Sequence, residues 1–200
     1  TAQVLLEVMA EMYAVYHGPK GLKEIAIRVR TKALALARAL SNVGLNIRHD
    51  LFFDTIRVDV PNDKLTIVLE RAEKSRMVFR IFDDSSIGIS LNERTTAEDL
   101  SSIVKIFDET KSLTEEIEIS LEELDADFPS NLARTSDFLT QNVFNAYQSE
   151  TEILRYIHKL QSRDLSLTTS MIPLGSCTMK LNATTEMLPV TWSEFSKIHP

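Results

Sequence analysis

The chain has 200 residues, 44% of them hydrophobic, which excludes global disorder because one large domain or two small ones can bury a core. Its 22 Lys and Arg residues face 29 Asp and Glu residues, and the net charge of −7 argues against a nucleic acid or an anionic membrane surface as partner. The single cysteine, Cys177, forms no internal disulfide, and no apolar run reaches the roughly 20 residues of a membrane span, so we expect a soluble intracellular protein.

Residues 4–43 carry the pattern of two helices separated by a break. Apolar residues recur from Val4 at three- and four-residue spacing, which predicts a helix that begins almost at the first residue. Residues 16–21 contain two glycines and a proline, which a continuous helix does not tolerate. A second helix is predicted over residues 21–43 with its Lys and Arg residues on the exposed face, and Gly44 stands where a left-handed residue ends a helix.

Residues 45–107 have the order strand, helix, strand, strand, helix. This order is typical of a small α+β unit with a mostly antiparallel sheet that helices cover on one face. The predicted elements are a strand with Ile56, Val58 and Val60 on its buried face, a helix that starts at residues 61–63, strands over residues 77–82 and 87–91 joined by the turn 83–85, and a helix opened by a capping box at residues 95–98.

Residues 108–127, here called the acidic connector, hold nine acidic side chains and one basic side chain, Lys111. Local repulsion and the following Pro129 indicate an exposed linker or domain boundary, which we extend over residues 108–133. Leucines and isoleucines are interleaved with the acids, so a helix on the surface of the protein is an alternative interpretation. We interpret the acids as a solvated face rather than as a metal site or a site for a basic partner.

The final part of the chain begins with a second capping box, at residues 149–152, which predicts a helix with Ile153, Leu154, Ile157 and Leu160 on its inner face. The last forty residues are irregular in pattern. Their hydroxyl side chains, together with Pro173 and Gly175, predict extended backbone and turns.

Residues 174–182 are the densest concentration of reactive side chains in the sequence. Gly175 permits a close backbone approach, and the hydroxyls and Lys180 could hold an anionic ligand. The glycines of a phosphate loop are absent, so an ordered turn that caps a helix stays an alternative. Cys177 has no histidine base nearby in the sequence, which favours an unreactive thiol over a nucleophile.

Metal binding is not predicted, because no two His or Cys residues lie at three- to five-residue spacing. We interpret His17 as a hydrogen-bonded structural histidine, with a role in lining a cleft as the alternative. Arg134 could meet a carboxylate with two parallel hydrogen bonds, although caps and packing explain its surroundings as well.

Several stretches of the sequence have unusual combinations of residues, and the same combinations occur in one known family. The matching stretches are residues 1–19, His49, residues 53–55, 145–152, 155–156, 170–182, 189–195 and 198–200. They resemble the P-protein family of the glycine cleavage system, glycine decarboxylase. The resemblance covers nearly the whole chain and is weakest across the acidic connector. We therefore expect the chain to be an internal segment of such an enzyme, spanning the junction of its two halves.

The resemblance implies an α/β parent of fold type I with two halves, the second of which holds pyridoxal phosphate. Residues 1–107 would end the N-terminal half with its small α+β domain, residues 108–133 would be the linker, and residues 134–200 would start the C-terminal half. The family removes CO2 from glycine and passes the aminomethyl group to the lipoyl arm of the H-protein. A homo-oligomer is expected, located in the cytoplasm of a bacterium or in the mitochondrial matrix of a eukaryote.

The resemblance also implies what this segment lacks. The Schiff-base lysine of the family lies in a His-Lys motif further along the parent, and His158 and Lys159 do not match that motif because Leu160 follows them. The segment alone is thus expected to be inactive, with no certain catalytic residue and no cofactor-binding or metal-binding residue. Many relatives carry histidines where this chain has Gln141 and Gln148. The candidates for lining the active site of the parent are Ser176, Cys177, Thr178 and Lys180.

Two other functions stay open. The segment could be a non-catalytic interaction or regulatory module whose acidic connector recruits a basic partner. A hydrolase that uses Cys177 as nucleophile is a further alternative and would require a reactive thiol at neutral pH.

Overall fold

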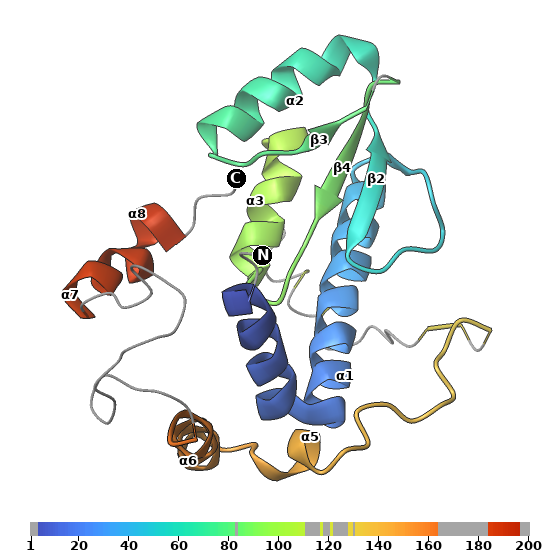
Figure 1. The fold of residues 1–200 in the computed structure, drawn as a ribbon. Coiled ribbons are helices and arrows are strands. Elements are labelled where there is room, and N and C mark those ends of the chain that lie inside the picture. Colours follow the sequence, from blue (N-terminus) through green and yellow to red (C-terminus); the bar gives the residue numbers. More distant parts are fainter. Residues whose placement is uncertain are drawn as a thin grey trace. The chain divides into compact units, whose positions relative to one another are not determined.

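The computed structural model of the chain describes residues 4–82, 84–110, 117, 121, 128–129, 131–163 and 184–196 (Figure 1). The chain divides into two compact units, Thr1–Gln148 and Ser149–Pro200. The first unit contains the sheet and the hydrophobic core, and the described part of the second unit is helical.

Helix α1 spans Val4–Asn42 and is broken at Gly18, where a φ of 60° and a ψ of −178° interrupt the helical backbone. Pro19 follows the break, in a position where its fixed φ suits the start of a new helix. The predicted pair of helices is confirmed. Gly44 has a φ of 87°, so the left-handed residue predicted beyond the end of the second helix is confirmed as well.

The sheet has the strand order β1-β2-β4-β3, and all neighbouring strands are antiparallel. The strands are β1 (Asn46–Ile47), β2 (Thr55–Asp59), β3 (Arg80–Ile81) and β4 (Ser86–Ser90). The predicted burial of Ile56, Val58 and Val60 is confirmed. The strand predicted over residues 77–82 is shorter than expected, because Met77 N donates to Ala72 O and closes the preceding helix.

Two further helices belong to the first unit, α2 (Asn62–Lys74) and α3 (Ala97–Phe107). The capping box of α3 consists of Thr96 and Asp99, so its prediction at residues 95–98 was wrong by one residue. The reason is that Thr95 belongs to the preceding turn: its amide donates to Asn92 Oδ1 over 3.1 Å. Thr96 therefore caps the helix: its hydroxyl accepts from the Asp99 amide over 3.2 Å, and its amide donates to the Asp99 carboxylate over 2.8 Å.

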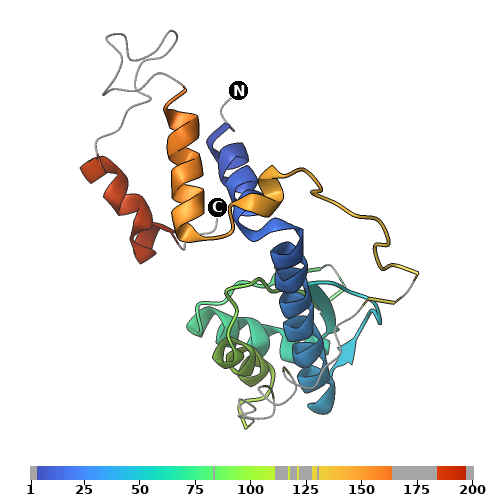
Figure 2. The ribbon, with the colours of Figure 1, turned by 90° about the horizontal axis from the view of Figure 1, so that it is seen from below.

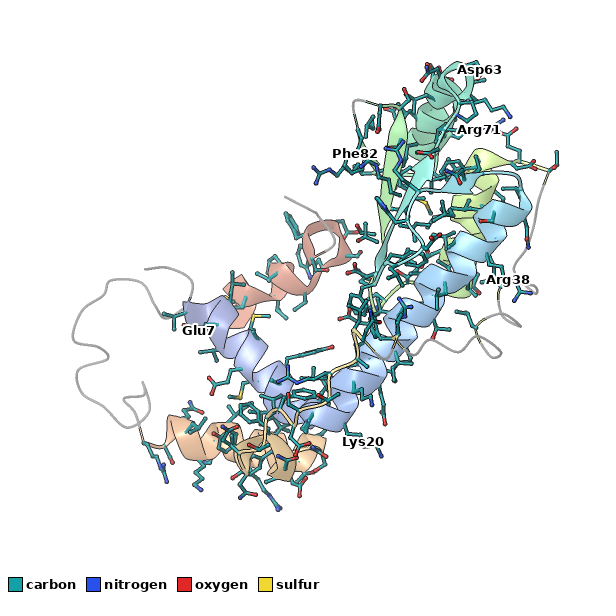
Figure 3. The ribbon with its side chains drawn as sticks, turned by 90° about the vertical axis from the view of Figure 1, so that its right-hand side faces the viewer. Glu7, Lys20, Arg38, Asp63, Arg71 and Phe82 are labelled. Atoms are coloured by element: carbon teal, nitrogen blue, oxygen red, sulfur yellow. The ribbon has the colours of Figure 1, made fainter. Side chains whose placement is uncertain are left out.

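The core lies between one face of the sheet and the second half of α1 together with α2 and α3 (Figures 1 and 2). Leu36 and Leu40 of α1 are fully buried, whereas Arg38 between them points outward (Figure 3). Burial of each such leucine contributes about 1.5–3 kcal/mol. The predicted small α+β unit, with an antiparallel sheet covered on one face by helices, is confirmed.

One residue of the acidic connector belongs to this core. Ile117 is only 1% exposed, and Leu121, four residues later, packs against the same cluster. A spacing of four residues places both side chains on one face of a helix. The prediction of an exposed connector is therefore wrong at these positions, since the interleaved apolar residues were the signal for packing.

The second unit contains helix α6 (Glu150–Gln161), whose N-cap Ser149 accepts a hydrogen bond from the Glu152 amide over 3.3 Å. The predicted helix is confirmed, but its apolar face is not covered within the described residues, and Leu154 is 65% exposed. Residues 184–196 form short helical turns, where extended backbone and turns were predicted. These are α7 (Thr184–Met187), the 3-10 helix η1 (Leu188–Thr191) and α8 (Ser193–Ser196).

Candidate functional site

The four residues predicted to line an active site, Ser176, Cys177, Thr178 and Lys180, lie outside the described residues. Several other stretches on which the family resemblance rests are described, among them residues 13–19 and residues 145–148. Although these two stretches are far apart in the sequence, the structure brings them together in the first unit. This junction is the best-defined candidate for a functional site among the described residues.

Helix α5 (Val143–Ala146) lies against the break of α1 (Figures 1 and 2). A Cβ atom at Gly18 would lie 2.3 Å from Gln148 Nε2 and 2.6 Å from the Phe144 carbonyl oxygen. Both distances are far below van der Waals contact, and the φ of 60° is one that side chains with a Cβ rarely adopt. The junction therefore depends on glycine for two separate reasons, backbone conformation and space.

Local hydrogen bonds give α5 its shape. Asn145 Nδ2 donates to the carbonyl oxygens of Leu139 and Gln141, each over 3.0 Å, and the Phe144 amide donates to Gln141 O over 3.1 Å. The Gln148 side chain donates to Phe144 O over 3.4 Å. Of the two glutamines singled out in the sequence, Gln148 thus contributes its side chain to the junction and Gln141 its carbonyl.

Two aromatic rings pack against His17, in the last turn of α1 before the break at Gly18. The centroid of its ring lies 4.3 Å from that of Tyr13 and 5.1 Å from that of Tyr16. Gly21 lies one turn further on, and a Cβ there would be 3.2 Å from the Cβ of His17. Ring packing therefore holds this histidine, while the choice between a structural role and a role in lining a cleft stays a prediction.

Arg30 forms a buried contact that the sequence pattern did not predict. Its side chain was expected on the exposed face of the second helix, but the residue is only 6% exposed. Its Nη1 donates to the Phe52 carbonyl oxygen, and its guanidinium carbon lies 4.4 Å from the centroid of the Phe128 ring. Phe53 also faces Phe128, with 5.9 Å between the centroids. A shielded cation over an aromatic ring contributes about 2 kcal/mol, so the contact offsets part of the cost of burial.

Arg134 and Lys32 are both held by backbone carbonyl groups. Arg134 Nε donates to Ser136 O over 3.1 Å, in place of the carboxylate that the sequence left open. Lys32 Nζ donates to Glu93 O over 2.9 Å, and burial, with Arg28 nearby, lowers the pKa of this ammonium group. Lys32 therefore fastens the turn before α3 to α1 rather than offering a free amine.

The face of the sheet that is turned away from the core carries an ion-pair cluster around Asp84. Its carboxylate accepts hydrogen bonds from Ser86, Arg48 and Arg57, and the pair with Arg57 Nη2 measures 2.9 Å. These contacts, led by the Ser86 hydroxyl, lower the pKa of Asp84 far below its ordinary value. Asp59 pairs with Arg48 Nε over 2.8 Å, so the cluster ties β1, β2 and β4 together. We interpret it as structural.

Two shallow cavities of about 270 and 210 Å³ open in the first unit. The larger is lined mainly by apolar side chains with Lys64 and Asp108 among them, and no lysine lines the smaller. A pyridoxal phosphate site needs a lysine together with donors for the phosphate, and neither cavity offers this combination. Neither of these two cavities therefore fits this cofactor.

The described residues contain neither a candidate metal site nor a candidate membrane span. No group of three or more His, Cys, Asp or Glu side chains there could hold a metal ion. No helix in the same part of the chain has the length and the apolar composition needed to cross a membrane. The candidate site itself consists of the packing and the hydrogen bonds at the α1–α5 junction.

Comparison with known proteins identifies one family. The sequence profile of the glycine cleavage system P-protein matches residues 1–107. The chain is 55% identical to glycine dehydrogenase (decarboxylating) of Nostoc punctiforme, 50% identical to the mitochondrial protein of this name from Pisum sativum and 48% identical to that from Mus musculus. Each alignment covers 100% of this chain but only 21%, 19% and 19% of these relatives, respectively. The chain thus spans about a fifth of their length.

Proposed function

The chain belongs to the glycine cleavage system P-protein family, and on that premise we propose that it works as a segment of a glycine decarboxylase. The observation that carries this proposal is the 55% identity to the Nostoc punctiforme protein in an alignment that covers the whole chain. In this function the complete enzyme decarboxylates glycine with pyridoxal phosphate. It then passes the aminomethyl group to the lipoyl arm of an H-protein.

Within such an enzyme of fold type I, residues 1–107 would end the first half, residues 108–133 would link the halves, and residues 134–200 would begin the second. The α+β core supports the first assignment, because it buries its own apolar residues. The enzyme would be a homo-oligomer in a bacterial cytoplasm or a mitochondrial matrix. Its Schiff-base lysine would lie outside these residues, further along the parent.

The loop with Ser176, Cys177, Thr178 and Lys180 would line the active site. Hydroxyl and ammonium groups are suitable donors for a carboxylate or a phosphate, the two anionic groups that the reaction brings to the site. Pyridoxal phosphate, when bound, supplies an electron sink for the carbanion left by loss of CO2. The part of this segment would be to bind and orient the anions and to exclude water.

A segment exchange tests the function. The matching fifth of the Nostoc punctiforme enzyme is replaced by this chain, and glycine-dependent exchange of labelled CO2 is measured with H-protein and pyridoxal phosphate. We expect an exchange rate within about tenfold of the parent, because all 200 residues align with it. The matched control is the Nostoc punctiforme enzyme in which the same segment is replaced by that of the Pisum sativum protein.

The proposal would be overturned if the enzyme with the Pisum sativum segment is active while the enzyme with this chain is inactive. The inactive enzyme must still be folded and loaded with pyridoxal phosphate. In the active variant, Lys180→Ala then tests the loop. Loss of a charged contact to substrate should lower kcat/KM about 100-fold, which corresponds to about 2.7 kcal/mol. Lys159→Ala, on an exposed position of α6, is the control and should leave the rate unchanged.

A further inference from the structure

Residues 128–148 lead from the acidic connector to the end of the first unit. In the part of this stretch that the structure describes, the regular element is α5, a helix of four residues. Both ends of the stretch nevertheless contact the same long helix, α1. Phe128 lies against Arg30, and Phe144 and Gln148 lie against Gly18.

Chain connectivity alone does not place these ends. Arg30 and Gly18 are separated by twelve residues, or about 18 Å along a helix at 1.5 Å per residue. The twenty residues from Phe128 to Gln148 could span about 66 Å if extended. The segment is more than three times longer than the distance it bridges, so specific contacts must select its path.

The first contact has the properties of an anchor. A nearly buried guanidinium is costly unless it is paired, and here it has a carbonyl acceptor in Phe52 and an aromatic face in Phe128. Removal of Phe128 from this position would expose the cation on that side. The amides of Leu132 and Ala133 donate to Pro129 O over 2.8 and 3.0 Å, so a local turn directly follows the anchored ring.

The second contact is an anchor of a different kind, based on shape. The absence of a Cβ at Gly18 lets the Phe144 carbonyl and the Gln148 amide approach the backbone of α1 closely. Gln148 is also the last residue of the first compact unit.

We propose that Arg30 and Gly18 are positioning residues that fix the two ends of residues 128–148 on helix α1. Each anchor acts on its own end, because the contacts of the two share no residue. This role is independent of the proposed enzymatic function. It can be tested on the full 200-residue chain without cofactor, substrate or partner.

Hydrogen exchange on the millisecond scale, resolved by residue with NMR, tests the shape anchor. Gly18→Ala should raise exchange at the Phe144 and Asn145 amides at least tenfold, because the added Cβ displaces α5. It should leave the amides of Leu132 and Ala133 unchanged. Gly44→Ala is the matched control, since Gly44 also has a positive φ, of 87°, but a Cβ there would meet nothing within 4 Å.

The charge anchor predicts the opposite pattern. Arg30→Met should raise exchange at Leu132 and Ala133 at least threefold and leave Phe144 and Asn145 unchanged. Arg30→Lys, which keeps the cation over the ring, should restore at least half of the lost protection. A residue with only a general structural role would instead change exchange at both ends and in the central β2–β4 pair alike.

Clear outcomes contradict the proposal. It fails if Gly18→Ala and Gly44→Ala change exchange in the same way, or if neither anchor variant alters residues 128–148 selectively. Should Gly18→Ala not fold, Gln148→Ala tests the same anchor with Gly18 intact. Loss of the side chain over Gly18 should then raise exchange at Phe144 about threefold, and an unchanged rate would overturn the role of this anchor.

Discussion

The two units of the chain treat their apolar residues differently. In the first unit Leu36 and Leu40 of α1 are fully buried against the sheet and α3. In the second unit Leu154 of α6 is 65% exposed, although α6 is as clearly amphipathic as the core helices. Trp192, further along the same unit, is 54% exposed. A periodic pattern therefore identifies the apolar face of a helix but does not say which surface, if any, covers that face.

The same contrast exists within α1. Met9, ahead of the break at Gly18, is 60% exposed, while Ala33 and Leu36, beyond it, are fully buried. Both halves have the apolar spacing of a packed helix. Only the second half has the sheet and α3 beside it, so the α+β core supplies most of the stability that the first unit can gain from burial.

The largest expected effect is therefore a core truncation. Leu36→Ala should lower the free energy of unfolding by about 2–5 kcal/mol, because it removes a fully buried side chain and leaves a cavity. Leu154→Ala, at an exposed position, should change it by less than about 0.5 kcal/mol. Urea unfolding followed by circular dichroism measures both. Equal losses would refute the contrast between the units.

Acid should weaken the first unit through Asp84. Its pKa is lowered in the folded chain, so its stabilisation is complete above the ordinary Asp pKa of about 3.9 and is lost as the pH falls toward the lower folded value. Between pH 6 and pH 2 the urea midpoint of the parent should fall more than that of Asp84→Asn. Asp137→Asn, at an exposed position, is the control and should follow the parent curve.

Each unit has a helix whose N-cap is a hydroxyl side chain, so removal of the same kind of cap can be compared between the two units. Thr96→Ala removes the capping hydroxyl of α3 and should cost about 1 kcal/mol of global stability. Ser149→Ala removes the same kind of cap from α6 and should fray that helix without moving the unfolding midpoint of the core. Hydrogen exchange in α6, measured beside urea unfolding, separates the two effects. A shift of the core midpoint by Ser149→Ala would show that α6 contributes to it.

The smallest expected effect concerns a buried hydroxyl. Ser101 is 3% exposed, and its Oγ has no hydrogen-bond partner among the described residues. Ser101→Ala should leave stability unchanged or raise it by up to about 1 kcal/mol, because an unpaired buried polar group is removed. Ser86→Ala should lower stability, since its hydroxyl binds both Arg57 and Asp84. A marked loss for Ser101→Ala in thermal unfolding would contradict this reasoning.

Much of the fold could be predicted because its signals are local. The glycines around residue 18, the alternation through Val58 and the hydroxyl before α3 each act within a few residues, and their predictions are confirmed or wrong by one position. The contacts between distant segments, at the candidate site and at Arg30, were less predictable. Nothing in the sequence near Arg30 distinguishes it from the exposed basic residues of the same helix, because its aromatic partner, Phe128, is about a hundred residues away.

The break in α1, the buried face of β2, the helix over residues 150–161 and the family could all be inferred from the sequence. Three features became visible only in the folded chain: Ile117 joins the core, Arg30 is buried, and Phe144 and Gln148 pack against Gly18. The two groups of features differ in the range of the interactions that produce them. Backbone preference and periodicity act between neighbours along the chain, whereas burial and close approach depend on which distant segment packs against a given surface.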